Sequence, residues 1–339
     1  MKTKNMPVEA ASSIYDLAQQ AGVSTSTVSR VLNHRSGIGS KTRKMILEQA
    51  RAAGFRPRMR ARQRTIAVVT DRNRYSKYGG FVTSLLGSIV QVLSKEDVSV
   101  ELVTEHNRAR LNERLVDGVL AMAWDEETLQ QLRNIGDVPV VTLNSVHTPE
   151  FSAVATDHRQ QALMAVQHFA RHGHRRIAMI CEEANNWGSR ERLLGFKAAM
   201  ATEGLPADDA LVSYSGHQPM YSLLHRIMNT VQPTAIFIAC ENLGLEATYI
   251  LQKVLGVRVP HDVSLIGMES PWASQFLSPP MTTIHQPLDE LAAAGLSMLL
   301  GLIERDREKG CKMLQNRLIE RESVMMVNPS RTRNIATTQ

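Results

Sequence analysis

Apolar residues near the N-terminus recur at helical spacing in two short segments. The apolar positions of the first segment share one helical face and are Ile14, Leu17, Ala18 and Ala21. Ser13 is a favoured N-cap type, and Gly22 follows the last turn, where a left-handed conformation favours glycine. Ser24 caps a second helix that begins at Thr25. Its apolar face consists of Val28, Val31 and Leu32. The pattern therefore predicts a helix-turn-helix.

The outer face of the second helix carries hydroxyl groups and a guanidinium that suit contacts to the base edges of DNA. The residues predicted to make these contacts are Thr25, Ser26, Thr27, Ser29, Arg30 and Asn33. Ser40 is expected to cap a third helix that extends through Ala53 and covers the first two, and Lys41 and Arg43 near its start are placed for DNA phosphates. Taken singly, these two cations are equally well explained as solvated charges. A short helical hairpin alone is also a common structural element.

From Ile66 onward, apolar runs alternate with helical stretches. The runs typical of buried parallel strands are Ile66–Thr70, Val98–Val103, Val116–Met122, Val138–Leu143, Ile177–Cys181, Ala235–Cys240 and Val263–Met268. The helical stretches lie near Val82–Ser94, Glu126–Ile135, Arg159–His172, Ser189–Glu203, Met220–Val231, Leu243–Leu255 and Leu288–Arg307. This alternation predicts right-handed βαβ units in doubly wound parallel sheets.

The number of strands indicates two sheets rather than one. A single sheet of about a dozen strands would be unusually large. Val154–Asp157 and His285–Pro287 have the pattern of crossings between two lobes. The predicted fold class is therefore α/β, with an N-terminal helix-turn-helix headpiece, a two-lobed core of doubly wound parallel sheets, and a cleft between the lobes.

Composition places the chain among ordinary globular proteins. Of its 339 residues, 43% are hydrophobic and 21% are charged. No apolar run reaches the length of a membrane span and the basic start lacks a hydrophobic signal core, so we expect a cytoplasmic protein with no membrane partner. Cys181, Cys240 and Cys311 are scattered without metal-ligand spacing and are expected to be free thiols.

The distribution of charge adds to the interpretation of the headpiece. Residues 1–64 contain 13 Lys and Arg against 3 Asp and Glu, whereas the remaining residues contain 26 against 30. A small basic segment joined to a mildly acidic body is typical of a module that binds a polyanion. A solvated basic arm is the alternative, but it would not explain the helix-turn-helix within the same segment.

The string A-G-V-S-x-x-T-V-S-R-V-L-N from Ala21 to Asn33 closely resembles the DNA-binding headpiece of the LacI/GalR family of bacterial repressors. Motifs in the family's order continue along nearly the whole chain. They include Val116-Asp-Gly-Val-Leu120, Gly173-His-Arg-Arg-Ile177, Arg192-Leu-Leu-Gly-Phe196, Val259-Pro-His-Asp-Val263, Pro279-Pro-Met-Thr-Thr-Ile284 and Arg321-Glu-Ser323. The resemblance implies a periplasmic-binding-protein-like core that senses a small metabolite.

The resemblance also implies a division into domains. The headpiece would span residues 12–57, a hinge linker 58–65, and the core 66–328. Lobe 1 of the core would comprise about 66–155 and 286–316, and lobe 2 about 156–285 and 317–328.

The linker departs from the family's pattern. In the family this segment becomes a short hinge helix on the operator, and a leucine wedges into the minor groove. Here Arg64 stands at the wedge position, and the next strand is expected to begin at once at Thr65. Arg58, Arg62 and Arg64 remain predicted DNA contacts. Arginine suits a narrow minor groove without intercalation, so we expect weaker operator bending than in typical relatives.

Polar residues follow several predicted strands of lobe 2, where doubly wound sheets bind ligands. Asp157, Arg192, Glu241 and Glu269 lie at or after strand ends, and Asp157 and Arg192 match the family's effector-contacting positions. The full set of predicted effector-binding residues is Phe81, Asp157, Trp187, Arg192, Cys240, Glu241, Glu269 and Leu288. The acids also suit a salt-bridged rim, and the aromatic residues suit plain packing as well as stacking on a sugar.

Two of these positions depart from the family's pattern. Cys240-Glu241 stands where the family usually has Asn-Asp, and Met268-Glu269-Ser270 stands where it usually has an aromatic residue followed by Asp-Asp. Each change lengthens a carboxylate and leaves less room, which points to a different effector or a degenerate pocket.

Signals for enzymes and metals are absent or poor. The chain has no GxSxG, HExxH, Walker A or GxGxxG motif, and we expect neither catalysis nor a cofactor. His168, His172 and His174 are better explained by a helix C-terminus than by a metal. The sequence predicts a homodimeric repressor of a catabolic operon that binds a palindromic operator and responds to a carbohydrate or derivative. The alternatives are a binding protein without regulation and an enzyme with a DNA-binding appendage.

Overall fold

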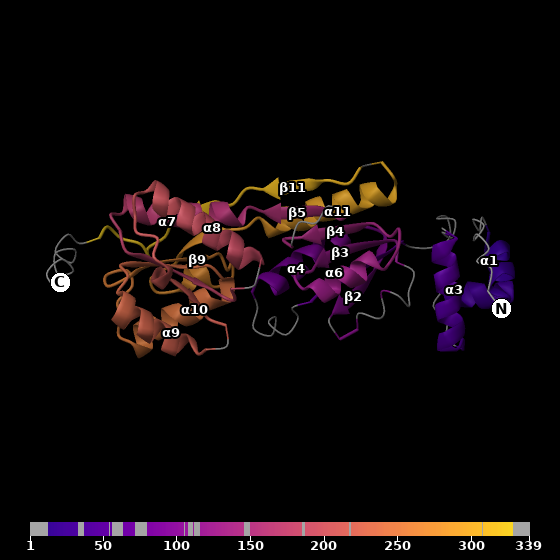
Figure 1. The fold of residues 1–339 in the computed structure, drawn as a ribbon, viewed down its shortest axis with the longest axis horizontal. Coiled ribbons are helices and arrows are strands. Elements are labelled where there is room, and N and C mark those ends of the chain that lie inside the picture. The colour runs from indigo at the N-terminus through magenta and orange to yellow at the C-terminus, as the bar shows by residue number, and fades with distance from the viewer. Residues whose placement is uncertain are drawn as a thin grey trace, which may run out of the picture. The chain divides into compact units, whose positions relative to one another are not determined.

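The chain falls into two compact units in the computed structural model (Figure 1). The structure describes residues 13–32, 37–53, 55, 64–71, 80–104, 106–107, 111, 116–145, 150–184, 187–216, 218–306 and 308–327. Unit 1 comprises Met1–Arg74, Leu86–Val154 and Ala292–Cys311. Unit 2 comprises Tyr75–Leu85, Ala155–Leu291 and Lys312–Gln339. Each unit is therefore assembled from three separate stretches of the sequence.

The N-terminal helices form the predicted helix-turn-helix and the helix that covers it. They are α1 (Ile14–Ala21), α2 (Thr25–Leu32) and α3 (Ser40–Ala52). The Ser13 side chain accepts a hydrogen bond from the Asp16 amide, and Gly22 ends α1 with φ of 63°. Apolar side chains from all three helices form a common core that includes Leu17, Val31 and Ile46. Ser40 is the first residue of α3 rather than the residue before it.

The first sheet has six strands. They are β1 (Arg64–Thr70), β2 (Val98–Thr104), β3 (Gly118–Met122), β4 (Val140–Leu143), β5 (Ser152–Thr156) and β11 (Cys311–Leu314), in the spatial order β11-β5-β4-β3-β1-β2. Its associated helices are α4 (Phe81–Leu93), α6 (Glu126–Arg133) and α11 (Leu288–Ile303). The pairs among β1 to β5 are parallel, and every residue of β3, β4 and β5 is buried, as expected of strands covered on both faces.

The second sheet repeats this arrangement. Its strands are β6 (Ile177–Cys181), β7 (Val212–Tyr214), β8 (Ala235–Ile238), β9 (Ser264–Met268), β10 (Thr282–His285) and β12 (Arg317–Ile319), in the order β12-β10-β9-β8-β6-β7. Its helices are α7 (His158–Arg171), α8 (Trp187–Thr202), α9 (Met220–Arg226) and α10 (Glu241–Tyr249). Short π-helical segments, Ile227–Val231 and Ile250–Val254, follow α9 and α10. The edge strand β12 is antiparallel to β10. Two doubly wound sheets confirm the predicted α/β class.

The prediction missed five strands, namely the edge strands β7, β11 and β12 and the inner strands β5 and β10. β7, β11 and β12 were not predicted, because they are short and most of their residues are only partly buried or exposed. The expected crossing segments Val154–Asp157 and His285–Pro287 contain the ends of β5 and β10. β1 begins at Arg64, one residue before the predicted start. Among the residues that the structure describes, no helix is long and apolar enough to span a membrane.

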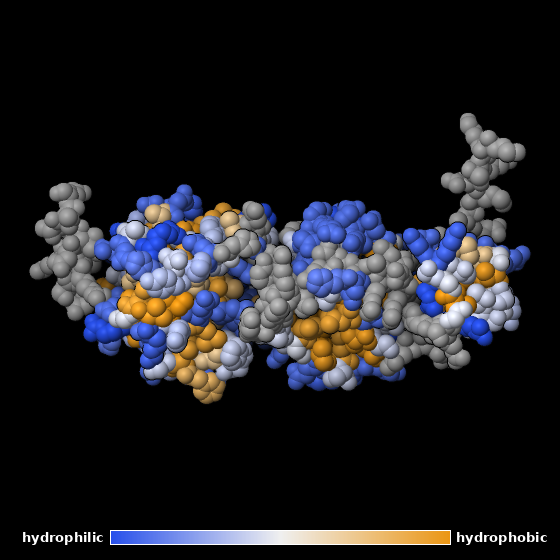
Figure 2. All heavy atoms as spheres, turned by 90° about the horizontal axis from the view of Figure 1, so that it is seen from below, coloured by the Kyte–Doolittle hydropathy of each residue, from blue (hydrophilic) through white to orange (hydrophobic). Residues whose placement is uncertain are grey.

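Unit 1 carries exposed apolar side chains on one edge strand and one helix. Val100 and Leu102 of β2 are 48% and 45% exposed, and Val90 of α4 is 55% exposed. Figure 2 shows an orange patch on the part of the surface formed by this unit. An exposed apolar patch of this kind is a candidate contact face.

Candidate functional site

The start of α2 is ordered by one serine. Ser24 Oγ accepts a hydrogen bond from the Thr27 amide at 3.1 Å, which caps the helix as predicted. The same oxygen lies 2.8 Å from Ser26 Oγ and 2.8 Å from Thr27 Oγ1. Ser26 and Arg30 are exposed, while Thr25, Thr27 and Ser29 are half-buried. The α2 surface therefore offers a guanidinium and hydroxyl groups on a rigid helix.

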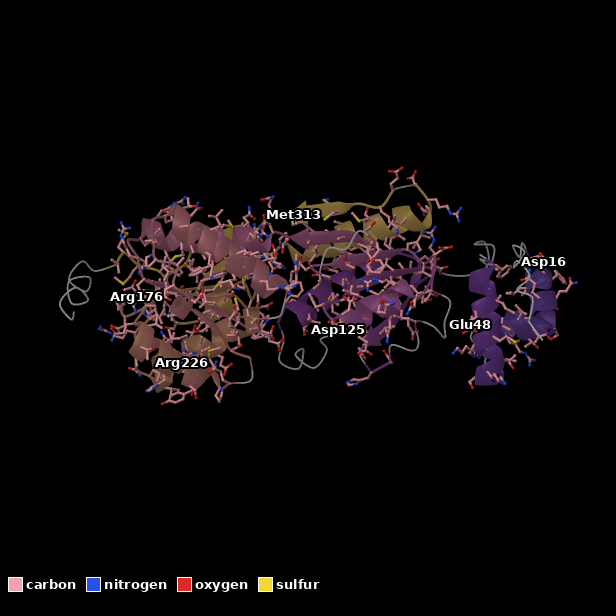
Figure 3. The ribbon with its side chains drawn as sticks, viewed as in Figure 1. Asp16, Glu48, Asp125, Arg176, Arg226 and Met313 are labelled. Carbon is pink, nitrogen blue, oxygen red and sulfur yellow. The ribbon has the colours of Figure 1, made fainter. Side chains whose placement is uncertain are left out.

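α2 carries positive but no negative side-chain charge, which suits binding to a polyanion. Asp16 and Glu48, both labelled in Figure 3, come from α1 and α3. Lys41 is exposed at the start of α3. Arg43 instead donates a long hydrogen bond of 3.5 Å to the Val31 carbonyl at the end of α2, so part of its role is to join α3 to α2. The predicted contacts Asn33, Arg58 and Arg62 lie outside the described residues.

Arg64 has a partner inside unit 1. It is the first residue of β1, and its guanidinium donates to Glu304 Oε1 at 2.8 Å. Its side chain is 25% exposed, and that of Glu304 is 50% exposed. A contact from Arg64 to DNA, which remains a prediction, requires this ion pair to open.

In unit 2, Arg192 lies near side chains at the carboxyl ends of β6 and β8. Its Nε donates to Gln161 Oε1 at 2.8 Å, the one hydrogen bond that the guanidinium makes to the described residues. Burial lowers the pKa of Arg192, and nearby Cys181, Cys240 and Glu182 act in the opposite direction. Burial raises the pKa of Cys181 to about 11 and that of Cys240 to about 12, so both thiols are neutral. The two terminal nitrogens of Arg192 are therefore available to a ligand.

Helix α7 brings a second group to this arginine. His158 Nδ1 lies 3.2 Å from Gln161 Oε1, and the His158 ring meets Trp187 edge-on with centroids 4.9 Å apart. Burial, followed by the charge of Arg192, lowers the pKa of His158 well below its ordinary value, so the imidazole is neutral. α7 and α8 can approach closely because Gly195 has no side chain; a Cβ atom there would collide with the Arg159 carbonyl oxygen. Two of the predicted residues, Trp187 and Arg192, thus meet through His158 and Gln161, which the sequence did not single out.

Glu241 is a buried acid at the first position of α10. Only 7% of it is exposed, and Ser84 Oγ of α4 donates to its Oε1 at 3.4 Å. Burial raises the pKa of Glu241 to about 7, against the lowering effect of the nearby Ser270 and Ser84 hydroxyls. Its carboxyl group is thus poised to accept or donate a hydrogen bond near neutral pH.

Glu269 is engaged by Arg321 in a two-pronged ion pair. The distances are 2.8 Å from Nη1 to Oε2 and 2.9 Å from Nη2 to Oε1, and the side chains are 8% and 16% exposed. Thr283 also donates to the Glu269 carboxylate. Burial opposes ionisation, but the bonds from Arg321 and Thr283 outweigh it and hold the pKa of Glu269 below its ordinary value. This is the salt-bridged arrangement that the sequence left open as the alternative to ligand binding.

The other predicted effector residues lie at helix starts. Asp157 caps α7 by accepting a hydrogen bond from the Gln160 amide at 3.0 Å. Phe81 begins α4 and Leu288 begins α11, and both are half-buried. Phe81 lies in the same turn as Ser84, which contacts Glu241.

The first sheet also holds an acid that the sequence reasoning missed. Asp71 follows β1, is 7% exposed, and accepts hydrogen bonds from the amides of Trp124 at 2.5 Å and Asp125 at 2.7 Å. Asp125, labelled in Figure 3, caps α6. The Trp124 indole donates to the Asn144 carbonyl at 2.7 Å. The available signal was an aspartate directly after the apolar run Ile66–Thr70.

Comparison with known proteins agrees with this arrangement. Residues 13–58 match the model for bacterial regulatory proteins of the lacI family, and residues 166–324 match that for a periplasmic binding protein-like domain. Curated relatives include the HTH-type transcriptional repressors PurR of Pasteurella multocida, 28% identical over 92% of this chain and 98% of that protein, and of Haemophilus influenzae, 27% identical over 87% and 92%.

Solved structures with this fold include a complex of the transcriptional regulator CelR with cellobiose. That chain is 26% identical, with a TM-score of 0.70 over 93% of this chain and 100% of its own length. A lac repressor dimer bound to operator and the anti-inducer ONPF, 21% identical, has a TM-score of 0.68 over 92% of this chain and 99% of that chain.

The fold and the matches define a DNA-binding regulator with a periplasmic-binding-protein-like core. The chain belongs to the LacI family of bacterial regulatory proteins. It is a transcriptional repressor of that family, and its relatives confirm the expectation that it is not an enzyme.

Proposed function

We propose that this repressor binds a palindromic operator as a cytoplasmic homodimer. A small metabolite that binds in unit 2 would weaken or strengthen its affinity for the operator. The observation that carries the metabolite site is Arg192, held by one nitrogen at the carboxyl ends of β6 and β8 with its terminal nitrogens available. The effector site consists of Trp187, Arg192, Cys240 and Glu241, with Asp157, Phe81 and Leu288 as further predicted contacts. The predicted division into a headpiece (12–57), a linker (58–65) and a core (66–328) belongs to the same proposal.

Operator recognition is assigned to α2 because its outer face combines an exposed arginine with hydroxyl groups and no acid. An arginine that grips a guanine contributes to specific binding, whereas a phosphate contact strengthens binding to every sequence. We therefore expect Arg30 to discriminate between sequences and Lys41 to act uniformly.

Fluorescence anisotropy with a palindromic site selected from random DNA tests the assignment. Arg30→Ala should weaken binding to that site by ~1–3 kcal/mol and lower the ratio of specific to random binding. Arg226→Ala, at an exposed arginine of α9, is the matched control and should change nothing. An unchanged ratio in Arg30→Ala would place the recognition surface elsewhere.

The effector is proposed to be a sugar or a related metabolite, which fits control of a catabolic operon. Paired donors on Arg192 suit vicinal hydroxyls, and Trp187 suits the apolar face of a sugar ring. A purine-related metabolite is the second candidate, since the curated relatives are PurR repressors and a planar base also stacks on an indole.

A thermal-shift screen of the full-length protein separates these candidates. The panel contains ribose, cellobiose, polyols, sugar acids, nucleosides and purine bases. A binding compound should raise the Tm of the wild type, and Arg192→Ala should lose this shift while still binding the operator. Arg190→Ala, an exposed arginine on the same helix, should keep it. A shift retained by Arg192→Ala would reject this site.

The homodimer is supported by exposed apolar side chains on each unit. Besides the patch on β2 and α4, unit 2 exposes 63% of Tyr249 and 76% of Phe276. These two side chains line a surface hollow of about 770 Å³. A palindromic operator needs two headpieces related by a two-fold axis, so a second copy of the chain is the proposed occupant of these surfaces.

Sedimentation at micromolar concentration should show a dimer. Leu102→Lys and Phe276→Lys should shift it toward monomer. Leu194→Lys, at a leucine 49% exposed on α8, should not. A tetramer or a stable monomer of the wild type would contradict the proposal.

A further inference from the structure

Hydrogen bonds with a fixed direction run from Arg192 into the start of α7. The side chain of Gln161 is fully buried and makes four hydrogen bonds. Its Oε1 lies 2.8 Å from Arg192 Nε and 3.2 Å from His158 Nδ1. Its Nε2 lies 3.3 Å from Thr156 Oγ1 and 3.0 Å from Asn316 Oδ1. Two donors and two acceptor sites are the full capacity of a side-chain amide, so Gln161 is saturated.

The chemistry of arginine fixes every direction in this network. A guanidinium only donates, so the oxygen of the Gln161 amide must face Arg192. Because that oxygen only accepts, His158 must carry its proton on Nδ1. His158 Nε2 is then a lone-pair acceptor, since the imidazole is neutral.

The remaining bonds agree with this assignment. The Gln161 amide donates to Asn316 Oδ1, and Asn316 Nδ2 in turn donates to the Asp157 carbonyl at 2.8 Å and to Gln160 Oε1 at 3.0 Å. Thr156 accepts from Gln161 and donates to Gln286 Oε1 at 3.0 Å. Reversing the Gln161 amide would set its NH₂ group against Arg192 and its oxygen against Asn316 Oδ1. The network therefore has one arrangement.

We propose that Gln161 is the positioning residue of the effector site. It holds Arg192 by Nε, which leaves both terminal nitrogens for the effector, and it fixes His158 in the tautomer whose Nε2 accepts a hydrogen bond. The site then selects molecules that present two acceptor atoms beside an O–H or N–H donor. Vicinal hydroxyls of a sugar and the carbonyl and N–H edge of a purine share this chemistry. The inference rests on the proposed effector site.

The tautomer of His158 tests the positioning role without any effector. In full-length protein with ¹⁵N-labelled histidine, the His158 signals are assigned by their loss in His158→Gln. The wild type should show the Nδ1–H form. Gln161→Leu removes the acceptor and should shift His158 toward the Nε2–H form. Gln160→Leu breaks bonds to Asn316 but none to Arg192 or His158, and should leave the tautomer unchanged.

A second variant covers the case in which Gln161→Leu fails to fold. Gln161→Glu has nearly the same shape and should keep Arg192 in place, while its negative charge should raise the pKa of His158. An Nε2–H tautomer in the wild type overturns the proposal. The proposal is also overturned if neither variant has an effect. That is the case if Gln161→Leu leaves the tautomer of His158 unchanged and Gln161→Glu leaves its pKa unchanged.

Titration calorimetry with ribose and with hypoxanthine tests whether the hydrogen bond from Arg192 to Gln161 affects the affinity for an effector. For a probe that binds the wild type, Gln161→Leu should weaken affinity by about tenfold or more, because a charge-assisted bond that orients the guanidinium is lost. Gln160→Leu should bind as the wild type does. If Arg192→Ala abolishes binding and Gln161→Leu does not, the positioning role is wrong and the site stands. If Arg192→Ala binds normally, the proposed site itself is wrong.

Discussion

The two sheets share one strand order but differ in the chemistry of their carboxyl ends. Both place the first strand between the second and the third, so the switch point lies between β1 and β3 in one sheet and between β6 and β8 in the other. At the first, the backbone amides of Trp124 and Asp125 engage Asp71. At the second, Arg192 keeps its terminal nitrogens available, and Glu241 stays buried with no cation beside it among the described residues. Glu269, after the neighbouring strand β9, is engaged by Arg321.

This difference shows that topology sets where a ligand can bind, whereas local pairing sets what remains to bind it. An acid that accepts two backbone hydrogen bonds stabilises the loop that supplies them. A buried acid without a cation costs free energy until a partner arrives. We therefore expect substitutions to separate the paired acids Asp71 and Glu269, which stabilise the fold, from Glu241, whose buried charge weakens it.

The largest effect is expected at the engaged acid of the second sheet. Arg321→Ala leaves the Glu269 carboxylate buried without its cation and should cost ~3–5 kcal/mol in the free energy of unfolding. The double variant Arg321→Met with Glu269→Leu removes both charges and should recover much of that loss. Urea unfolding followed by circular dichroism measures both. A loss below ~1 kcal/mol in Arg321→Ala would show that the pair is solvated.

Glu241 should show the opposite sign and depend on pH. Its pKa is about 7 in the folded chain, above the ordinary value of 4.5, so the folded state holds a proton that the unfolded state releases. The cost is absent below pH 4.5, grows as pH rises, and is complete above pH 7. Glu241→Gln should therefore stabilise the protein by up to about 3 kcal/mol at pH 8 and leave it unchanged at pH 4.

Unfolding curves at the two pH values test this directly. Glu246→Gln, at an exposed acid on the same helix, is the control and should show no such dependence. Equal stability of Glu241→Gln and the wild type at pH 8 would mean that Glu241 is paired with a cation.

Asp71 should give a smaller loss. Asp71→Ala leaves the amides of Trp124 and Asp125 without their acceptor, at a cost of ~1–3 kcal/mol. Asp71→Asn keeps one carbonyl oxygen and should lose less. Thermal unfolding measures the stability of both variants. If Asp71→Ala is as stable as the wild type, Asp71 does not stabilise the first sheet.

Arg64, at the opposite end of β1, should matter least for stability. Its pair with Glu304 is partly solvated, so Arg64→Ala should cost under ~1 kcal/mol. Circular-permutation gel mobility should show weak operator bending in the wild type and no change in the variant. A strong bend that survives Arg64→Ala would contradict the expectation of weak bending.

The sequence predicted the elements whose pattern is local. Buried strands such as β3 and β8 are continuous apolar runs, and the caps at Ser13 and Ser24 are set by adjacent residues. The edge strands β7, β11 and β12 were not predicted because short strands with one open side lack such runs. The inner strands β5 and β10 were predicted only as crossing segments. Their place depends on partners far away in the chain, as in the pairing of Thr283 with Ile319.

The site was predictable only as a set of positions. Arg192 stands at a family position and Trp187 was a candidate for stacking, and the structure joins them through Gln161 and His158. The use of each polar group was not visible, because the partner of Glu269 is Arg321, 52 residues away, and that of Gln161 is Asn316, 155 residues away. Hydrogen-bond partners at such separations follow from the three-dimensional packing.

The division of each unit among three stretches of sequence has a consequence for synthesis. The headpiece helices contact only one another in their common core, so that domain contains all it needs once residue 55 has emerged from the ribosome. The second sheet gains β12 only after residue 319 has been synthesised, and Ser323 then bonds to Leu265 and Thr282 of the same unit. A nascent headpiece can therefore fold well before the core that regulates it.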